Sequence, residues 1–535
     1  MIGVAAGPNE WDTVREFFEL FKTPWEPAVA GPTYRVVVST IGPPAGVETD
    51  LVIAYGSAES EIDRAARVNV KSAPAGQKAE WAGASFPLYR GAAGFDNGGA
   101  STLRSECWTL DYRASIQGRK YWRVGYDLFD EVRYLLTEGQ PPSHALTPTL
   151  DLHIALLRGL LIQSGVPFLE VTPHPPRCDF ICCLTHDIDF FGVRRHVFDR
   201  TLAGFVARAS LGSLADLIRR RRPLTEALRN WAAVLSLPLV LLRALPDFWR
   251  PLEDYERADG ARPSTFFVIP FRDRAGVAPD GGVEPTRAVR YQASEIAGQL
   301  QSAAARGREM GVHGIDAWHD EDAGRAELAQ VAPLAGQTKA GVRMHWLYFA
   351  SDSPGRLEAA GFDYDSTCGY NDAVGYRAGT SQVFCLPVSE RLMELPIAIM
   401  DTALFYPSRL DLPRREALDR CRRIVAHARR AGGTVVVNWH DRSLAPERLW
   451  GRAYDELLDE LDDCRPWFAT AAEAVEWFRW RRSVTFTREP DGAVTIQSGP
   501  SRPGLPGAVV AVQRPARDVH EKVTLDGGAV VRVRL

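Results

Sequence analysis

The most regular feature of the chain is a set of apolar runs that each stop at a polar residue. Residues 178–189 read Cys-Asp-Phe-Ile-Cys-Cys-Leu-Thr-His-Asp-Ile-Asp, so an apolar run ends in Asp187 and Asp189. Strand alternation places these two carboxylates on one side and Ile188 on the other. Two neighbouring acids at the mouth of an apolar strand repel each other and lose hydration. The pattern therefore indicates either a cation or a shared proton between them, or a role in capping the next helix.

Three later runs repeat this pattern. Residues 308–320 place His313 at a predicted strand end, with Asp316 and His319 behind it, residues 340–346 place Arg343 and His345, and residues 432–442 place His440. Further strands are predicted at 264–271 and 392–401, and helical patterns at 285–306, 413–430 and 446–464 separate most of the strands. Strands that alternate with helices predict a parallel sheet. Reactive residues at the carboxyl ends of its strands indicate an α/β barrel or an open α/β sheet.

Four of these segments, in this order, resemble the motifs of a known superfamily. They are Thr185-His-Asp-Ile-Asp, Gly311-Val-His-Gly, Gly341-Val-Arg-Met-His-Trp and Val435-Val-Val-Asn-Trp-His. Together they resemble the polysaccharide deacetylase superfamily, the carbohydrate esterases with a NodB-homology domain, over residues 176–482. The resemblance implies a distorted, incomplete (β/α)7 barrel. It also implies a metal-dependent hydrolase that removes an N-acyl group, acetyl or formyl, from an amino-sugar of a polysaccharide or its precursor.

The resemblance also implies roles for single residues. Asp187 matches the catalytic base, Arg343 the arginine that orients the base, and His440 the general acid. Asp189 and His313 match ligands of a divalent metal ion. In contrast, His186 points to the opposite strand face from the acids and is interpreted as a packing residue.

The chain departs from the superfamily pattern at two positions. Position 317 is Ala, where the pattern has a second metal histidine four residues after the first. We therefore expect His319, or less readily Asp316, as the third ligand. A mixed carboxylate and imidazole set favours zinc over magnesium or calcium. The second departure is His345, which replaces a proline of the pattern and could be either structural or catalytic.

Three further residues are expected to contact the substrate. Trp346 and Trp439 lie next to the predicted ends of catalytic strands, and Arg377 lies in a polar, glycine-rich loop at 375–380 that could line a sugar site.

The remaining sequence predicts two accessory regions. A chain of 535 residues is long enough for about three domains. Residues 1–175, with strands predicted at 34–40 and 50–55 and a helix at 150–164, predict a mixed α/β accessory domain. Residues 483–535 contain short apolar stretches between Gly- and Pro-rich turns, and predict a small β appendage.

One long insertion interrupts the predicted barrel at residues 190–262, and its pattern is mostly helical. Residues 194–229 contain nine arginines, and an uncharged apolar stretch at 231–242 follows. This stretch is too short to span a bilayer and contains Pro238. The insertion is either a helical excursion packed beside the barrel or an interfacial helix that contacts an anionic membrane and a lipid-linked sugar.

The composition limits which partners and which cellular compartment are expected for the chain. The net charge of −4 argues against a polyanionic partner, so we expect no nucleic acid. The eight cysteines show no regular spacing and read as reduced thiols. The first residues lack a basic start followed by an apolar core, so a cytoplasmic location is expected, with peripheral contact at the inner membrane face as an extension of it.

Two other classes of protein fit part of the pattern. Asp187-Ile-Asp189 could be the DxD motif of a glycosyltransferase, although that leaves His313 and His440 unexplained and the chain lacks a Gly-rich nucleotide loop. A non-catalytic carbohydrate-binding relative is the second alternative, because Ala317 disrupts the ligand spacing. The presence of residues that match the base, the acid and the orienting arginine argues against it.

Overall fold

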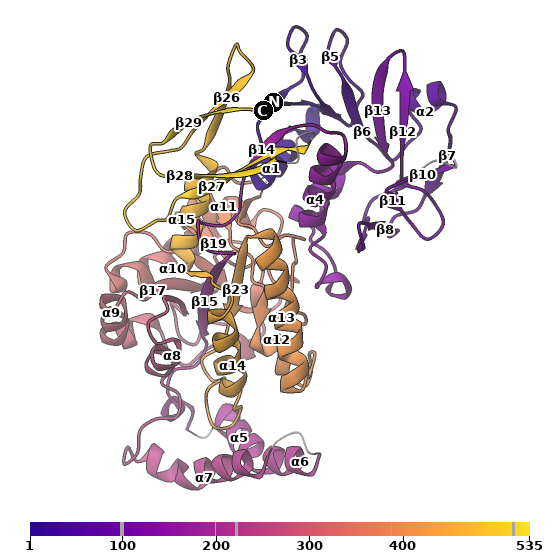
Figure 1. Cartoon of the computed structure of the whole chain (residues 1–535). Helices are drawn as coiled ribbons and strands as arrows, with labels where there is room; N and C mark the ends of the chain where they lie inside the picture. Colours follow the sequence, from indigo (N-terminus) through magenta and orange to yellow (C-terminus); the bar gives the residue numbers. More distant parts are fainter. Residues whose placement is uncertain (97–100, 198, 220–222, 387, 516–518) are drawn as a thin grey trace. The chain divides into compact units, whose positions relative to one another are not determined.

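The structure is a computed structural model that describes residues 1–96, 101–197, 199–219, 223–386, 388–515 and 519–535 (Figure 1). The chain divides into two compact units. Unit 1 comprises Met1–Pro176, Tyr376–Pro387 and Trp477–Leu535, and unit 2 comprises Arg177–Gly375 and Val388–Glu476.

Unit 2 is built on an open sheet whose strands run parallel. The strand order is β21-β19-β18-β17-β16-β15-β23-β22, and β24 also pairs with β15. These strands are β15 (Ile181–Ile188), β16 (Ser264–Val268), β17 (Glu309–Gly314), β18 (Val342–Met344), β19 (Tyr364–Asp365), β21 (Met393–Glu394), β22 (Ile399–Met400), β23 (Thr434–Asn438) and β24 (Trp467–Phe468). The predicted α/β class and parallel sheet are thus confirmed, and the sheet curls into part of a barrel without closing.

The composition of β15 and β23 explains their central place. All eight residues of β15 and all five of β23 are buried. A parallel strand covered on both faces is expected to be almost continuously apolar, as the Ile-Cys-Cys-Leu run and the three valines of β23 are. Polar residues such as Asp187 and Asn438 come at the carboxyl ends of both strands, which places them at the same edge of the sheet.

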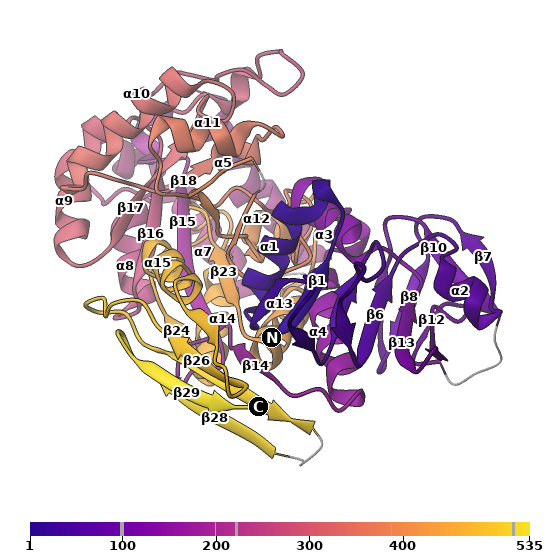
Figure 2. The same cartoon turned by 90° about the horizontal axis from the view of Figure 1, so that it is seen from above.

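Helices cover this sheet. They are α8 (Pro251–Asp259), α9 (Ala297–Ala305), α10 (Glu321–Val331), α11 (Ser353–Ala360), α12 (Asp401–Phe405), α13 (Arg414–Ala431) and α14 (Gly451–Asp462). Figure 2 shows α9, α10 and α11 along the outer side of β16, β17 and β18. The helix predicted at 285–306 is shorter than expected: residues 285–296 form two 3-10 turns and a loop, and only Ala297–Ala305 is α-helical. These turns, the first of which begins at Pro285, stand where the first half of the helix was predicted.

The insertion at 190–262 is helical, as predicted. It contains α5 (Arg200–Ala207), a π-helical segment (Arg208–Gly212), α6 (Ser213–Ile218) and α7 (Leu224–Leu241), before α8 returns to the sheet. Figure 1 shows α5, α6 and α7 gathered at one end of unit 2, beyond α8. Phe205, Val240 and Trp249 belong to a buried cluster that ties these helices to Ala445.

Unit 1 is a mixed α/β structure. Its largest sheet has the order β12-β13-β6-β4-β1-β2, with only the β12–β13 pair antiparallel. The strands are β1 (Ile2–Ala5), β2 (Trp25–Pro27), β4 (Val37–Ser39), β6 (Leu51–Tyr55), β12 (Asp111–Ile116) and β13 (Arg119–Val124), and the helices are α1 (Trp11–Phe21), α2 (Glu61–Ala66), α3 (Leu128–Thr137) and α4 (Thr149–Gln163). Small antiparallel pairs are formed by β7 (Asn69–Ala73) with β10 (Ala92–Asp96), and by β8 (Lys78–Trp81) with β9 (Ala84–Pro87) and β11 (Leu103–Arg104).

The C-terminal strands belong to the same unit as the N-terminal residues. The strand β14 (Phe168–Val171) pairs with β27 (Ala508–Arg514), which pairs with β28 (Val519–Leu525). A second antiparallel sheet contains β25 (Thr485–Arg488), β26 (Ala493–Gln497) and β29 (Val530–Arg534). The hairpins predicted for residues 483–535 are present, and the pairing of β14 with β27 joins one of them to the N-terminal region.

Candidate active site

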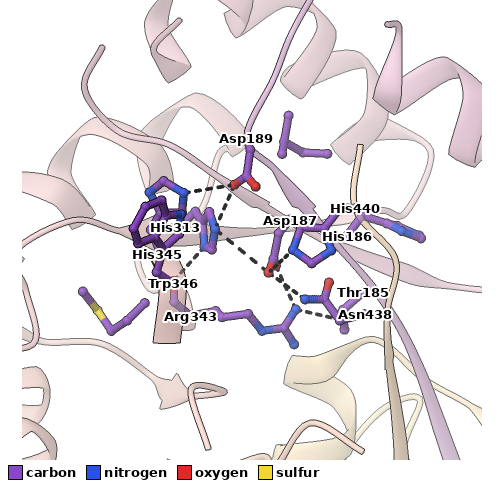
Figure 3. Close-up of polar contacts among 12 residues, drawn as sticks. Thr185, His186, Asp187, Asp189, His313, Arg343, His345, Trp346, Asn438 and His440 are labelled. Atoms are coloured by element: carbon purple, nitrogen blue, oxygen red, sulfur yellow. Dashed lines mark hydrogen bonds and ion pairs between the residues drawn. The ribbon is translucent and has the colours of Figure 1, made fainter. Parts of the chain in front are cut away.

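The carboxyl ends of four strands bring the candidate residues of unit 2 together. Because β18, β17, β16, β15 and β23 are adjacent in the sheet, the ends of these strands meet at one edge. Asp187 lies at the end of β15, His313 at the end of β17, Arg343 on β18 and His440 just after β23. Figure 3 shows Asp187 between Arg343 and His440, with Asp189 beside the two histidines His313 and His345.

The carboxylate of Asp187 is buried and held on both oxygens. Arg343 donates from Nη1 to Asp187 Oδ1 at 2.9 Å, and Asn438 donates from Nδ2 to Oδ2 at 2.7 Å. Burial alone would raise the pKa of Asp187, but the charge of Arg343, assisted by His313 and His440, holds that pKa below its ordinary value. Asp187 is therefore an ionised carboxylate at neutral pH, the state that a general base needs.

The guanidinium of Arg343 is itself fixed. It is fully buried and donates to the carbonyl and the hydroxyl of Ser366, both at 3.0 Å, and to Thr185 Oγ1 at 2.9 Å. Its Cζ atom lies 4.3 Å from the ring centroid of Phe267. These contacts leave one orientation for Arg343, and Arg343 in turn aims Asp187.

Asp189, His313 and His345 form a group suited to a metal ion. Their ligand atoms lie within 4.8 Å of one another. Asp189 Oδ1 lies 3.2 Å from His313 Nε2 and 3.5 Å from His345 Nε2, yet this buried oxygen makes no well-aligned hydrogen bond among the described residues. An orphaned carboxylate oxygen facing two imidazole nitrogens fits a divalent ion of the zinc type.

The protonation states also fit such an ion. His313 Nδ1 lies 2.9 Å from the carbonyl of Arg343, which can only accept, so Nδ1 donates a proton there and Nε2 is the nitrogen left to bind a metal ion. Burial lowers the pKa of His345 to about 3, which keeps this ring neutral. Burial would raise the pKa of Asp189, but His345 and His313 lower it well below its ordinary value.

The structure places His345, rather than His319 or Asp316, in this group. After β17 the chain turns and α10 begins only at Glu321, so His319 is displaced and lies 3.3 Å from Asp316. Asp316 Oδ1 also accepts a hydrogen bond from the N–H of Val277 at 2.8 Å. In this structure His319 and Asp316 thus lie outside the group, and the β17–β18 pairing, rather than spacing along one segment, brings His345 beside His313.

His345 reaches the group at the end of β18, immediately before a reversal of the backbone. His313 pairs with Arg343 across β17 and β18, so the residue after Met344 lies beside His313, with ring centroids 4.9 Å apart. Trp346 and Leu347 have φ of 64° and 57°, a left-handed conformation that is costly for residues with a Cβ. Arg287 donates to the carbonyl of His345 at 2.9 Å and holds this reversal in place.

His440 lies on the other side of Asp187. Its Nε2 is 3.8 Å from Asp187 Oδ2, and its Nδ1 is 2.6 Å from Asp401 Oδ1. Asp401 Oδ2 accepts from the backbone N–H of His440 at 2.7 Å and from the hydroxyl of Ser443. Burial alone would lower the pKa of His440, but Asp401 and then Asp187 raise it to about 10. His440 is thus protonated at neutral pH, as a general acid must be.

These residues open into a cavity of about 820 Å³ in unit 2. Trp346 lines the cavity and is partly exposed, as expected of a residue that contacts substrate. Trp439, which was expected to do the same, is fully buried against Tyr454 and Phe405, so a sugar cannot reach it. Arg377 belongs to unit 1, where its carbonyl accepts a hydrogen bond from Gln140 at 2.7 Å.

The opposite face of β15 behaves as the alternation predicts. His186 is buried, its ring centroid lies 3.7 Å from that of Tyr255, and its ring nitrogens contact the carbonyl of Trp439 at 2.9 Å and Asp259 at 3.1 Å. The prediction that His186 packs in the core is confirmed.

Sequence reasoning missed three contributors to the site. Asn438 lies within a quoted motif but its contact with Asp187 needed the β15–β23 register, in which it pairs with Thr185. Asp401 follows the apolar run at 395–400, the same signal that marked Asp187. Asp441 lines the cavity, and burial, followed by the charge of Asp189, raises its pKa to about 8.

Among known proteins, only solved structures were found to be similar to this chain. No family model and no curated protein matches the chain. Agd3, described as a novel carbohydrate deacetylase, is 9% identical, with 99% of this chain and 98% of that chain covered at a TM-score of 0.37. A structure described as Puue allantoinase is 13% identical, with 58% of this chain and 93% of that chain covered at a TM-score of 0.35.

The polysaccharide deacetylase Bc1974 from Bacillus cereus is 10% identical, with 54% of this chain and 91% of that chain covered at a TM-score of 0.25. Several of the similar solved structures are thus described as deacetylases of the kind that the sequence motifs resemble. All these TM-scores are below 0.5, so the functional inference depends on the residues of the site.

Proposed function

We propose that the chain is a metal-dependent hydrolase of the polysaccharide deacetylase type, which removes an N-acetyl or N-formyl group from an amino-sugar. The observation that supports this most strongly is the pairing of an ionised Asp187 with a protonated His440, 3.8 Å apart, next to Asp189, His313 and His345. Two titratable groups whose surroundings drive their pKa values apart are the signature of an acid–base pair.

The group formed by Asp189, His313 and His345 would hold a divalent ion, zinc by its ligand chemistry. When bound, such an ion supplies a Lewis acid that polarises an acyl carbonyl and acidifies a water molecule. Burial keeps His345 neutral and the neighbouring rings keep Asp189 ionised, and these are the states in which an imidazole and a carboxylate bind a metal.

The proton transfers belong to Asp187 and His440. Asp187, held by Arg343 and Asn438, accepts a proton from the attacking water through its Oδ2. As the carbon–nitrogen bond breaks, His440 donates its Nε2 proton to the departing amine, and Asp401 stabilises the imidazolium until then. Water and an amide are thereby converted to a carboxylic acid and an amine.

The reaction class can be tested by its small product. Purified protein with zinc is incubated with N-acetylated and N-formylated amino-sugar oligosaccharides, and released acetate and formate are quantified. We expect one acid to appear together with an equal amount of free amine. A glycosyltransferase would instead consume a nucleotide-sugar, and a carbohydrate-binding protein would bind the oligosaccharide without changing it. Either of these results, without acid release, would contradict the proposal.

The contact between Asp401 and His440 predicts a change in the pH profile. Since Asp401 helps to raise the pKa of His440 to about 10, the parent should stay active on the alkaline side until pH approaches that value. In Asp401→Asn the pKa of His440 should fall, so the alkaline limb of kcat/KM should move down by about 1–3 pH units. Steady-state rates measured across the pH range test this. An unmoved alkaline limb would show that His440 is not the acid.

A further inference from the structure

The helices of the insertion expose an unusual amount of apolar surface. Among the described residues, large hydrophobic side chains are exposed in the π-helical segment, on α6 and α7 and just beyond α7, at Leu211, Leu214, Ile218, Leu224, Leu228, Leu235, Leu239, Leu242 and Leu245. The exposed fractions reach 71% at Leu211, 74% at Ile218, 77% at Leu242 and 81% at Leu235. Single exposed leucines are common in soluble proteins, but a contiguous group this large marks an interaction surface.

On α7 the exposed leucines form one stripe. Positions 224, 228, 235 and 239, and position 242 at the C-cap, recur at helical spacing and therefore lie along one face. The opposite face, with buried residues at 226, 230, 233, 237 and 240, packs against the protein. A surface helix whose outward face is apolar is expected to contact an apolar environment, such as lipid or another protein.

A second stripe runs beside the first. Leu211, Leu214 and Ile218 are spaced three and four residues apart, and α6 packs against α7. Figure 1 shows the two helices next to each other at the end of unit 2. We call the exposed apolar residues of these two stripes together the leucine face.

The charge around the leucine face is basic. Residues 200–245 contain eight arginines and only two acidic residues, Asp216 and Glu226, although the whole chain has a net charge of −4. Glu226 is buried and paired with Arg452 at 3.0 Å. Exposed arginines accompany the leucines: Arg229 lies on α7, Arg208 in the π-helical segment and Arg243 just beyond the end of α7. Basic side chains around an apolar helix face match the anionic headgroups and acyl chains of a membrane interface.

From these observations we propose that the leucine face docks on an anionic phospholipid membrane. Arg200–Ile218 is long and apolar enough to cross a bilayer by length and composition. However, Phe205 and Ala209 in this stretch are fully buried against Trp249 and Val240. Spanning the bilayer would expose this cluster, whereas lying in the interface leaves it intact. The helices therefore lie along the membrane surface.

The active-site cavity lies next to the insertion that carries the leucine face. The cavity is lined by Phe190, Asp199, Arg200 and Thr201, so the insertion that forms the leucine face also forms one wall of the cavity. If the proposed deacetylase function holds, the amino-sugar substrate is one attached to a lipid and presented at the membrane surface. This substrate class rests on the proposed function, whereas the docking does not.

Docking is tested with the full chain and vesicles, without any measure of catalysis. We expect the parent to sediment with vesicles of phosphatidylcholine and phosphatidylglycerol and to be released by high salt. Leu235→Gln combined with Leu239→Gln should lower the partition coefficient by at least about tenfold. Ile41→Gln, which replaces a 63% exposed isoleucine outside the insertion, serves as the matched control and should bind like the parent.

Arginine variants test the chemistry of the headgroup. Arg229→Gln combined with Arg243→Gln should weaken binding to the anionic vesicles by about tenfold and leave binding to pure phosphatidylcholine unchanged. Acid release from a soluble N-acylated oligosaccharide should stay at the parent level in all these variants.

Two results would overturn the docking. One is a parent protein that stays in solution with anionic vesicles. The other is a parent that forms a dimer without lipid, which the leucine variants convert to a monomer, since a second copy would then cover the leucine face. Loss of acid release in the parent would contradict the proposed function and leave the docking intact.

Discussion

Replacing Asp187 with Asn lowers kcat by about 100-fold or more, the usual scale for the loss of a general base. The amide has nearly the shape of the carboxylate and its oxygen can still accept from Arg343, but it cannot accept the proton of the attacking water. The measurement is the rate of acid release at saturating substrate, together with the metal content of the purified variant. The metal content should equal that of the parent, because Asp187 is not among the three proposed ligands.

Asp199→Asn is the matched control for this change. Asp199 lines the same cavity, but its carboxylate contacts His196 at 2.7 Å and caps α5, and it has no part in the proposed proton transfer. Its rate should stay near that of the parent. Arg343→Ala should act through Asp187, so adding it to Asp187→Asn should cost much less than the sum of the two single effects. An Asp187→Asn variant with parent turnover would rule out Asp187 as the base.

The second large effect is expected at His345. His345→Ala removes one of three ligand side chains from a buried group, and we expect it to lower the affinity for zinc by at least about 100-fold. His319→Ala is the control that the chain itself offers, because His319 contacts Asp316 and lies outside the group. The measurement is zinc occupancy at equilibrium with a competing chelator, determined for both variants and the parent.

The two histidines give opposite expectations, which makes the test decisive for the ligand set. If His345→Ala keeps its zinc while His319→Ala loses it, the sequence-based ligand set is correct and the group of Asp189, His313 and His345 is not the metal site. Circular dichroism of both variants shows whether either one has lost its fold.

The parts of the site that follow from strand order could be predicted from the sequence. Asp187, Asp189, His313 and His440 each end or follow an apolar run, and the carboxyl ends of parallel strands meet at one edge whatever the loop lengths are. The same reasoning predicted the packing role of His186, because side-chain alternation along one strand is a local property.

The rest depends on contacts between distant segments. The choice between His345 and His319 required the β17–β18 register and the left-handed turn at Trp346, neither of which leaves a mark in local periodicity. Trp439 lies next to His440 in the sequence, yet the residue after β23 turns into the aromatic core. The pairing of β14 with β27 joins residues more than 300 positions apart, so no local pattern could have indicated it.

The measurement that tests the central claim most directly is acid release as a function of zinc added to metal-free protein. With an N-acylated amino-sugar oligosaccharide as substrate, the rate should be near zero without metal, rise with added zinc and level off at one equivalent per chain. Metal-free protein that releases acid as fast as the reconstituted protein, or reconstituted protein that releases none, would contradict the proposal that Asp187 and His440 act beside a metal held by Asp189, His313 and His345.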